Sequence, residues 1–271
     1  MGLSILVAVP AAGAVALAFT DFSGVGSPRF VGLDNFDRLL GDEAFWRALG
    51  NSAIYALVSV PLRLAAAATF ALLLYKRGPG VGAARATAYL PSVVPDAAYA
   101  LVWLWLLNPL YGPIPAALDA TGLGSPGWLT DPWAARFAIG VMGAFQIGEG
   151  FVIALAARHA IPTYLYEAAE VDGARPSFVL SRITLPLMAP VLGLLALRDV
   201  VLSFQVSLVP ALLVTDGGPR LATTYLPLYI YRAGFRYFRL GYAATMTLAM
   251  FVITVLVVLA QVRLARRMRL T

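Results

Sequence analysis

The sequence contains no cysteine and only one histidine, His159. Without cysteine the chain has no disulfide, no thiolate metal ligand and no cysteine nucleophile. It also lacks a histidine–carboxylate spacing suited to a catalytic metal, and no Gly-Lys-Ser/Thr loop is present to hold the phosphates of a nucleotide. An enzymatic function is therefore not expected, and if ATP drives the activity of this protein, another subunit must hydrolyse it.

Charged residues are scarce as well. They make up 13% of the 271 residues, while 60% are hydrophobic and the mean hydropathy is +0.79. Soluble domains contain about 25% charged and about 45–50% apolar residues, so lipid must solvate much of this exterior. The composition predicts an all-α membrane protein, and we attribute its net charge of +6 to membrane topology rather than to nucleic-acid binding.

Six apolar stretches are long enough for spanning helices, which need about 20 residues. They lie near residues 2–19, 52–75, 86–107, 137–157, 185–210 and 241–262. We expect one polytopic transmembrane domain over residues 1–271. The first stretch has no basic leader, so we interpret it as a membrane anchor rather than a signal peptide. It starts at Met1 without a cytoplasmic lead, which leaves open a longer natural N-terminus.

Positive charge predicts the orientation of the spans. If the C-terminus is cytoplasmic, the inner segments hold 10 Lys or Arg in 44 positions and the outer segments 8 in 97. Lys and Arg are enriched on the cytoplasmic side of membrane proteins. Four arginines directly follow the last apolar stretch: Arg263, Arg266, Arg267 and Arg269. We therefore predict a multi-pass protein with a cytoplasmic C-terminus.

The inner loop at residues 158–182 is polar and carries clear helix signals. Pro162 can open a helix, Gly173 can close it, and Pro176 can start a second one. Glu167 and Glu170 share one face of the first helix, while Ala168, Ala169 and Val171 offer a small apolar face. Such a helix suits docking into a groove on a soluble partner. The alternative is a solvated loop with well-capped helices.

The same loop carries an ordered motif. Glu167-Ala168-Ala169 is followed after three residues by Gly173, and after nine more by Ile183, Leu185 and Pro186. With this motif the chain resembles the membrane subunits of binding-protein-dependent ABC importers. The resemblance implies the type I importer fold, with six spans and a cytoplasmic coupling-helix loop. It also implies that the contacts with the ATPase subunit are made by Glu167, Ala168, Ala169, Glu170, Asp172 and Gly173.

Further segments, including residues 31–36 and 215–219, are similar to the carbohydrate branch of this family, which contains maltose and glycerol-phosphate permeases. The resemblance implies a permease for a sugar or sugar-like solute in the cytoplasmic membrane of a bacterium or archaeon. Its partners would be a second permease subunit, two ATPase subunits, an extracytoplasmic solute-binding protein and membrane lipid, with no nucleic acid. ATP and Mg would bind the ATPase, and this chain would hold no cofactor. Phe145, Arg158 and Tyr164 depart from the residue types typical of the branch.

Five ionisable residues fall inside the predicted spans: Arg63, Asp96, Glu149, Arg198 and Asp199. An ionised side chain at mid-bilayer costs roughly 2.5–3.5 kcal/mol on insertion scales, and such residues usually face a bundle interior or a wet cavity.

Helical spacing groups some of these residues with polar neighbours. Gln146 and Glu149 share one face, and Asp199 and Ser203 share another. We predict that these four residues line the substrate pathway, with Phe145 as a stacking surface. The alternative is that the charges pair within the bundle, for example Arg63 with Asp96, or Arg198 with a carboxylate.

Two other classes of protein fit part of this pattern. Intramembrane carboxylates also suit an ion-coupled secondary transporter or a channel subunit. A scaffold without transport activity would tolerate changes in both polar faces. Dependence of uptake on ATP and on a co-purifying ATPase separates the importer from these alternatives.

Overall fold

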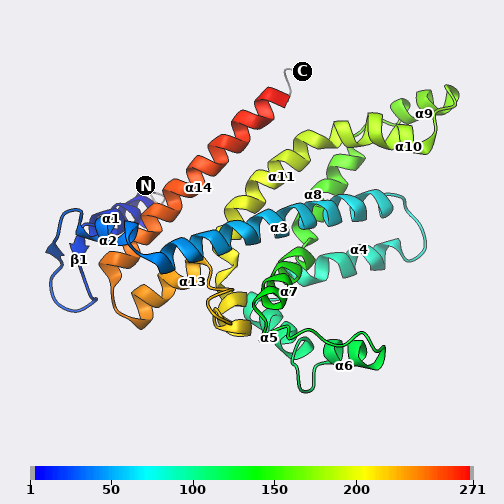
Figure 1. Cartoon of the computed structure of the whole chain (residues 1–271). Coiled ribbons are helices and arrows are strands. Elements are labelled where there is room, and N and C mark those ends of the chain that lie inside the picture. Colours follow the sequence, from blue (N-terminus) through cyan, green and yellow to red (C-terminus); the bar gives the residue numbers. More distant parts are fainter. Residues whose placement is uncertain (1–3, 269–271) are drawn as a thin grey trace.

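The computed structural model describes residues 4–268, which are mostly helical (Figure 1). Gly2, in the first predicted span, and Arg269, in the basic tail, lie outside the described residues. The α-helices are α1 (Val9–Leu17), α2 (Asp34–Leu40), α3 (Glu43–Leu73), α4 (Val81–Tyr89), α5 (Asp96–Leu106), α6 (Pro113–Ala120), α7 (Pro132–Phe145), α8 (Gly148–His159), α9 (Tyr164–Val171), α10 (Pro176–Val179), α11 (Leu185–Val206), α12 (Leu208–Pro210), α13 (Leu226–Tyr231) and α14 (Leu240–Met268). Strand β1 (Thr20–Asp21) pairs antiparallel with β2 (Arg29–Phe30).

Within the described residues, three helical segments are long and apolar enough to cross a membrane: Glu43–Leu73, Pro176–Thr215 and Leu240–Leu264. The second consists of α10, a π-helical turn at Leu180–Thr184, α11, α12 and a final π-helical turn at Ala211–Thr215. These segments overlap the predicted spans 52–75, 185–210 and 241–262. Helix α3 has 31 residues, and at 1.5 Å per residue it is longer than the bilayer core of about 30 Å.

The predicted span 137–157 is broken into two helices. Helices α7 and α8 meet at a bend of 46° and pass the length and composition test only as a pair. The amide of Gly148, at the start of α8, donates to Ser92 Oγ at 2.9 Å. The first amides of a helix have no partner within it, so the Ser92 hydroxyl satisfies a group that the break leaves free.

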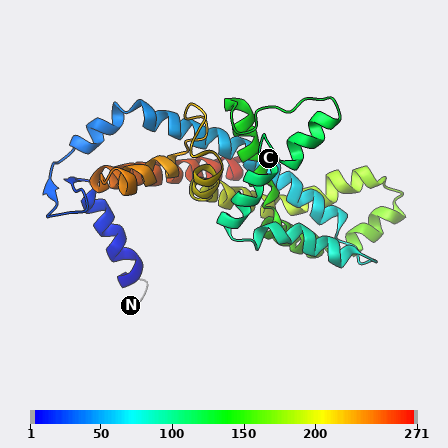
Figure 2. The ribbon, with the colours of Figure 1, turned by 90° about the horizontal axis from the view of Figure 1, so that it is seen from below.

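The predicted spans 86–107 and 2–19 are represented by shorter apolar helices. Residues 86–107 cover the end of α4, a 3₁₀ turn at Leu90–Ser92 and then α5. Pro91 and Pro95 interrupt this stretch because proline lacks an amide hydrogen and cannot continue an α-helix. Near the N-terminus, Ile5–Leu17 is a second short apolar helix; it contacts α14, and its N-terminal end projects away from the other helices (Figure 2).

Helix α3 lies at the centre of the bundle and packs against α7, α8 and α11. Its buried face includes the small residues Ala48, Ser52, Ala56, Ser59, Ala67 and Ala71. Small residues at helical spacing let neighbouring backbones approach closely inside a membrane. Gly143 of α7 faces the Tyr55 ring so closely that a β-carbon there would overlap the hydroxyl. The central packing therefore depends on small side chains from both partners.

At the N-terminal end of α3, the carboxylate of Asp42 connects three helices. Its Oδ1 accepts hydrogen bonds from the amides of Ala44 and Phe45 at 2.9 and 3.2 Å, which caps α3. Its Oδ2 accepts from the hydroxyls of Tyr229 in α13 and Tyr242 in α14 at 2.6 and 2.5 Å. Burial acts to raise the pKa of Asp42, but these four hydrogen bonds outweigh it and hold the pKa below the ordinary 3.8.

We expect Asp42→Ala to lower the free energy of unfolding by about 2–4 kcal/mol, because it removes a helix cap and the acceptor of two hydroxyls. The folded pKa lies below the unfolded one, so this stabilisation is present above about pH 4 and is lost as the pH falls through the lowered pKa. Thermal unfolding in detergent at pH 7 and at about pH 3.5 would measure both effects.

Asp37→Ala serves as the control, because Asp37 is an exposed acid on α2. It should change the unfolding free energy by less than about 0.5 kcal/mol. Equal melting temperatures for Asp42→Ala and Asp37→Ala would contradict the assignment.

Candidate functional site

A helical hairpin is formed by α9 and α10. Gly173 follows α9 with a left-handed φ of +67°. Its amide donates to the Glu170 carbonyl at 3.0 Å, and the Ala174 amide donates to the Ala169 carbonyl at 2.9 Å. This arrangement satisfies the last carbonyls of α9, and glycine adopts it without a side-chain penalty. The first helix and the turn expected in this loop are present, whereas the second helix, α10, is not separate: it continues through a π-helical turn at Leu180–Thr184 into α11.

Most of the residues predicted to contact an ATPase are exposed. They are Glu167, Ala168, Glu170, Asp172 and Gly173. Val171 is also 87% exposed, whereas Ala169 is buried. The apolar face expected from Ala168, Ala169 and Val171 is thus divided, because Ala169 packs inward while the other two point outward. The outer surface of α9 combines carboxylates with one large apolar side chain.

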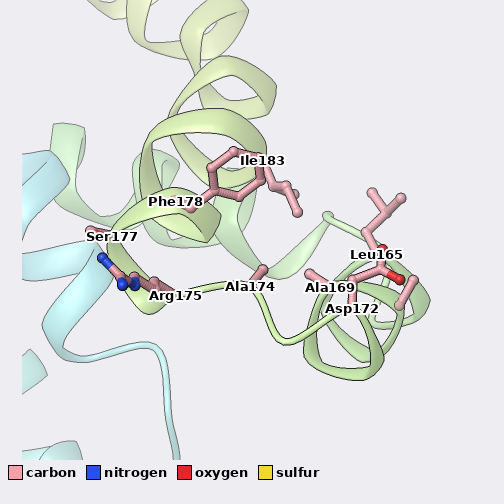
Figure 3. A pocket seen from close by; sticks show the side chains of 9 residues that line it. Leu165, Ala169, Asp172, Ala174, Arg175, Ser177, Phe178 and Ile183 are labelled. Atoms are coloured by element: carbon pink, nitrogen blue, oxygen red, sulfur yellow. The ribbon is translucent and has the colours of Figure 1, made fainter.

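A cavity of about 580 Å³ lies between α9 and α10. Figure 3 shows Leu165 and Asp172 on the α9 side and Phe178 and Ile183 on the opposite side. Sequence reasoning did not single out Leu165 or Phe178. Leu165, Ala169 and Asp172 lie four and three residues apart, and this spacing was the available signal for a shared inner face.

A second group of candidate functional residues lies between the predicted spans. Four of the five ionisable residues there form a continuous series of ion pairs. Arg63 Nη1 lies 3.8 Å from Asp199 Oδ2, and Arg198 Nη1 lies 3.3 Å from Asp199 Oδ1. Arg198 also pairs with Glu149. These ion pairs connect α3, α11 and α8. The pairing alternative is therefore realised, but Arg63 pairs with Asp199 rather than with Asp96.

The Arg63–Asp199 end of this series of ion pairs is shielded from solvent. Arg63 is 7% exposed and Asp199 is 2% exposed. Arg63 Nε also donates to the Gly143 carbonyl at 3.0 Å, which ties α3 to α7. An unpaired buried charge would be strongly destabilising, so each partner is needed to hold the other. The fifth charge, Asp96, accepts a hydrogen bond of 3.4 Å from the Gln146 amide.

The predicted pathway residues fall into two environments. Phe145, Gln146 and Glu149 lie beside the break between α7 and α8. Phe145 is 58% exposed, and the Glu149 side chain is 56% exposed. By contrast, Asp199 and Ser203 are buried within the bundle, and the Ser203 hydroxyl donates to the Asp199 carbonyl at 2.7 Å. Arg198 connects the two polar faces, because it pairs with both Glu149 and Asp199.

The accessible side of this group offers an amide, a carboxylate, a guanidinium and an aromatic ring. The Phe145 ring packs edge-on against Trp103, with 5.5 Å between centroids, and its position is thereby constrained. Such a surface can hydrogen-bond and stack on a polar solute. Within residues 4–268, no cluster of three His, Asp or Glu residues has the geometry of a metal site.

Comparisons with known proteins support one family. A family model described as "Binding-protein-dependent transport system inner membrane component" matches residues 65–270. The probable ABC transporter permease protein YesP of Bacillus subtilis is 31% identical over 96% of this chain and 85% of its own length. The trehalose/maltose transport system permease protein MalF of Thermococcus litoralis is 35% identical over 82% of this chain and 74% of its own.

A solved structure has the same fold. It is a chain of a bacterial alginate ABC transporter in complex with an alginate pentasaccharide-bound periplasmic protein. The two chains superpose with a TM-score of 0.86 at 25% identity, covering 98% of this chain and 90% of the other.

The buried pair predicts strongly coupled mutational effects. Arg63→Met and Asp199→Leu should each lower the free energy of unfolding by about 3–5 kcal/mol, because each removes one member of the buried pair and leaves the charge of the other less compensated. The double variant Arg63→Met/Asp199→Leu should lose far less than the sum, since it removes both charges. Thermal unfolding of the four proteins in detergent gives the coupling energy.

The exposed pair of Glu43 and Arg47, 3.7 Å apart on α3, provides the control. Arg47→Met should change stability by less than about 1 kcal/mol. Additive losses for Arg63 and Asp199 would show that the buried contact does not stabilise the bundle.

Proposed function

Because the chain belongs to the family of binding-protein-dependent transport system inner membrane components, we propose that it is the permease subunit of an ATP-driven importer for a sugar or sugar-like solute. The observation that carries this proposal is the exposed, capped geometry of α9. Its Glu-Ala-Ala…Gly motif forms a largely exposed helix with a capped end, and we place this helix on the inner side of the bundle. A membrane subunit without a nucleotide site of its own needs such a surface to receive work from a separate ATPase.

The proposed topology has six spans and a cytoplasmic C-terminus. The broken pair α7 and α8 forms one span, α4 with α5 forms another, and the N-terminal helix forms a third beside the three long ones. Irregular backbone inside a membrane is tolerated where protein or a wet cavity surrounds it. We place the protein in a cytoplasmic membrane, with α9 and the arginine-rich end of α14 on the inner face.

The proposed solute is a carbohydrate, in keeping with the names of the trehalose/maltose and alginate relatives. Gln146 and Glu149 would hydrogen-bond hydroxyl groups, and Phe145 would offer a face to a sugar ring. Asp199 and Ser203 belong to the same proposed pathway but act from behind the surface, because Asp199 holds Arg198, which in turn holds Glu149.

The proposed complex contains a second permease subunit, two ATPase subunits that bind ATP and Mg, and an extracytoplasmic binding protein. The binding protein delivers the solute at the outer side. Closure of the ATPase pair moves Glu167, Glu170 and the neighbouring residues of α9, and the spans rock to open the pathway inward.

Uptake by the reconstituted complex tests the function directly. A tag on this chain should recover an ATPase from native membranes, and proteoliposomes holding the complex and its binding protein should accumulate radiolabelled maltose, trehalose or another sugar of a test panel only with ATP inside. A proton or sodium gradient without ATP should give no uptake. Accumulation driven by the gradient alone would favour an ion-coupled transporter instead.

Glu149→Gln should raise the KM for the transported sugar about tenfold or more, since a hydrogen bond to a charged group contributes about 1.5–3 kcal/mol. Co-purification of the ATPase should be unchanged. Glu43→Gln, at an exposed acid outside the proposed pathway, is the matched control. An unaltered KM for Glu149→Gln would remove this carboxylate from the pathway.

A further inference from the structure

Arg158, at the end of α8, lies between two tyrosine rings from distant parts of the chain. Its guanidinium carbon is 4.1 Å from the centroid of Tyr75 and 4.4 Å from that of Tyr166. Tyr75 lies two residues beyond the end of α3, and Tyr166 belongs to α9. Both distances are well within the range of about 6 Å over which a cation is attracted to an aromatic face.

The arginine is enclosed by this arrangement and is not simply resting on the surface. Arg158 is 9% exposed although it lies in a polar inner segment. Within residues 4–268, no carboxylate comes within ion-pair distance of it. The two rings are therefore its principal partners, and attraction between a cation and a π-face strengthens when water is removed from the contact.

Tyr166 extends the contact to a third helix. Its hydroxyl lies 3.1 Å from Thr184 Oγ1, directly before α11, and Thr184 is 3% exposed. Leu165 and Tyr166 also pack against a buried apolar cluster that includes Ala71 of α3, Ala154 of α8 and Met188 of α11. One end of α9 is thus attached to the inner ends of α3, α8 and α11, while Val171 at its other end is exposed.

We propose that Tyr75, Arg158 and Tyr166 form a joint that makes α9 and the inner ends of α3, α8 and α11 move as one body. The inference rests on the proposed function, because the movement is supplied by the ATPase that α9 contacts. Arg158 is a positioning residue in this assignment, since it touches neither solute nor nucleotide. Without the joint, a push on α9 would bend the loop instead of moving the spans.

Distance measurements between two spin labels can test the joint before any solute is known. The chain has no cysteine, so Leu73→Cys and Val171→Cys provide unique labels at exposed positions on α3 and α9. In the tagged complex, the label distance should have one narrow distribution that is the same without nucleotide and with ATP and vanadate. Arg158→Met should broaden it and make it nucleotide-dependent. Nucleotide-dependent distances in the otherwise unaltered complex, or an unchanged distribution in Arg158→Met, would overturn the proposal.

The amount of sugar imported per ATP hydrolysed provides a functional test of the joint. Arg158→Met should lower the amount of sugar imported per ATP hydrolysed about tenfold, in line with the loss of a two-faced cation–π contact, while ATPase co-purification persists. Arg158→Lys and Tyr75→Phe should retain most of the coupling, because they keep the cation and the ring, whereas Tyr75→Leu should not. Loss of the ATPase from Arg158→Met would assign the residue to docking and overturn the proposed role in transmission.

Arg182→Met is the matched control, because it removes the same charge from an exposed position in the same inner segment. It should leave the label distances and the coupling ratio unchanged; equal effects of Arg158→Met and Arg182→Met would reduce the joint to a general charge effect and contradict it. Failure of the proposed function has a different signature: no ATPase co-purifies and ATP drives no uptake in the unaltered protein, yet the label distribution still distinguishes Arg158→Met from the parent chain.

Discussion

Two ionised side chains buried in the bundle, Arg63 and Asp199, impose its main constraint. Arg63, Asp199, Arg198 and Glu149 satisfy one another across three helices, so the register of α3, α8 and α11 is fixed by charge as well as by packing. A slip of one helical turn would separate the partners by about 5.4 Å and leave a charge buried alone. The small residues along α3 then allow the backbones to approach closely enough for these contacts.

The break between α7 and α8 lies beside Glu149, at the exposed end of this series of ion pairs. A continuous helix would direct all its amides along its own axis, whereas the break frees the Gly148 amide for Ser92 and brings Gln146 within reach of Asp96. Interrupted helices occur inside membranes where neighbours can satisfy the freed polar groups. Here the interruption places Phe145, Gln146 and Glu149 together on one accessible side, next to the buried pair.

The sequence predicted local features better than partnerships. The proline and glycine positions predicted α9 and its end, because capping depends on residues close together in the chain. Charge and hydropathy identified the intramembrane residues, but not that Arg63 faces Asp199, since that choice depends on how α3 packs against α11. The burial of Ala169 and the cavity beside it likewise follow from tertiary packing. The stacked position of Arg158 could not be foreseen, because its two rings come from segments far apart in sequence.

That arrangement has a consequence for engineering. Exchanging the inner loop between relatives is an obvious way to re-pair a permease with a foreign ATPase, and the natural boundaries of the graft would enclose α9 and α10. Such a chimera would carry Tyr166 of the donor but neither its Tyr75 nor its Arg158. A graft that keeps this contact must therefore also carry Tyr75, which lies two residues beyond α3 and outside the exchanged segment.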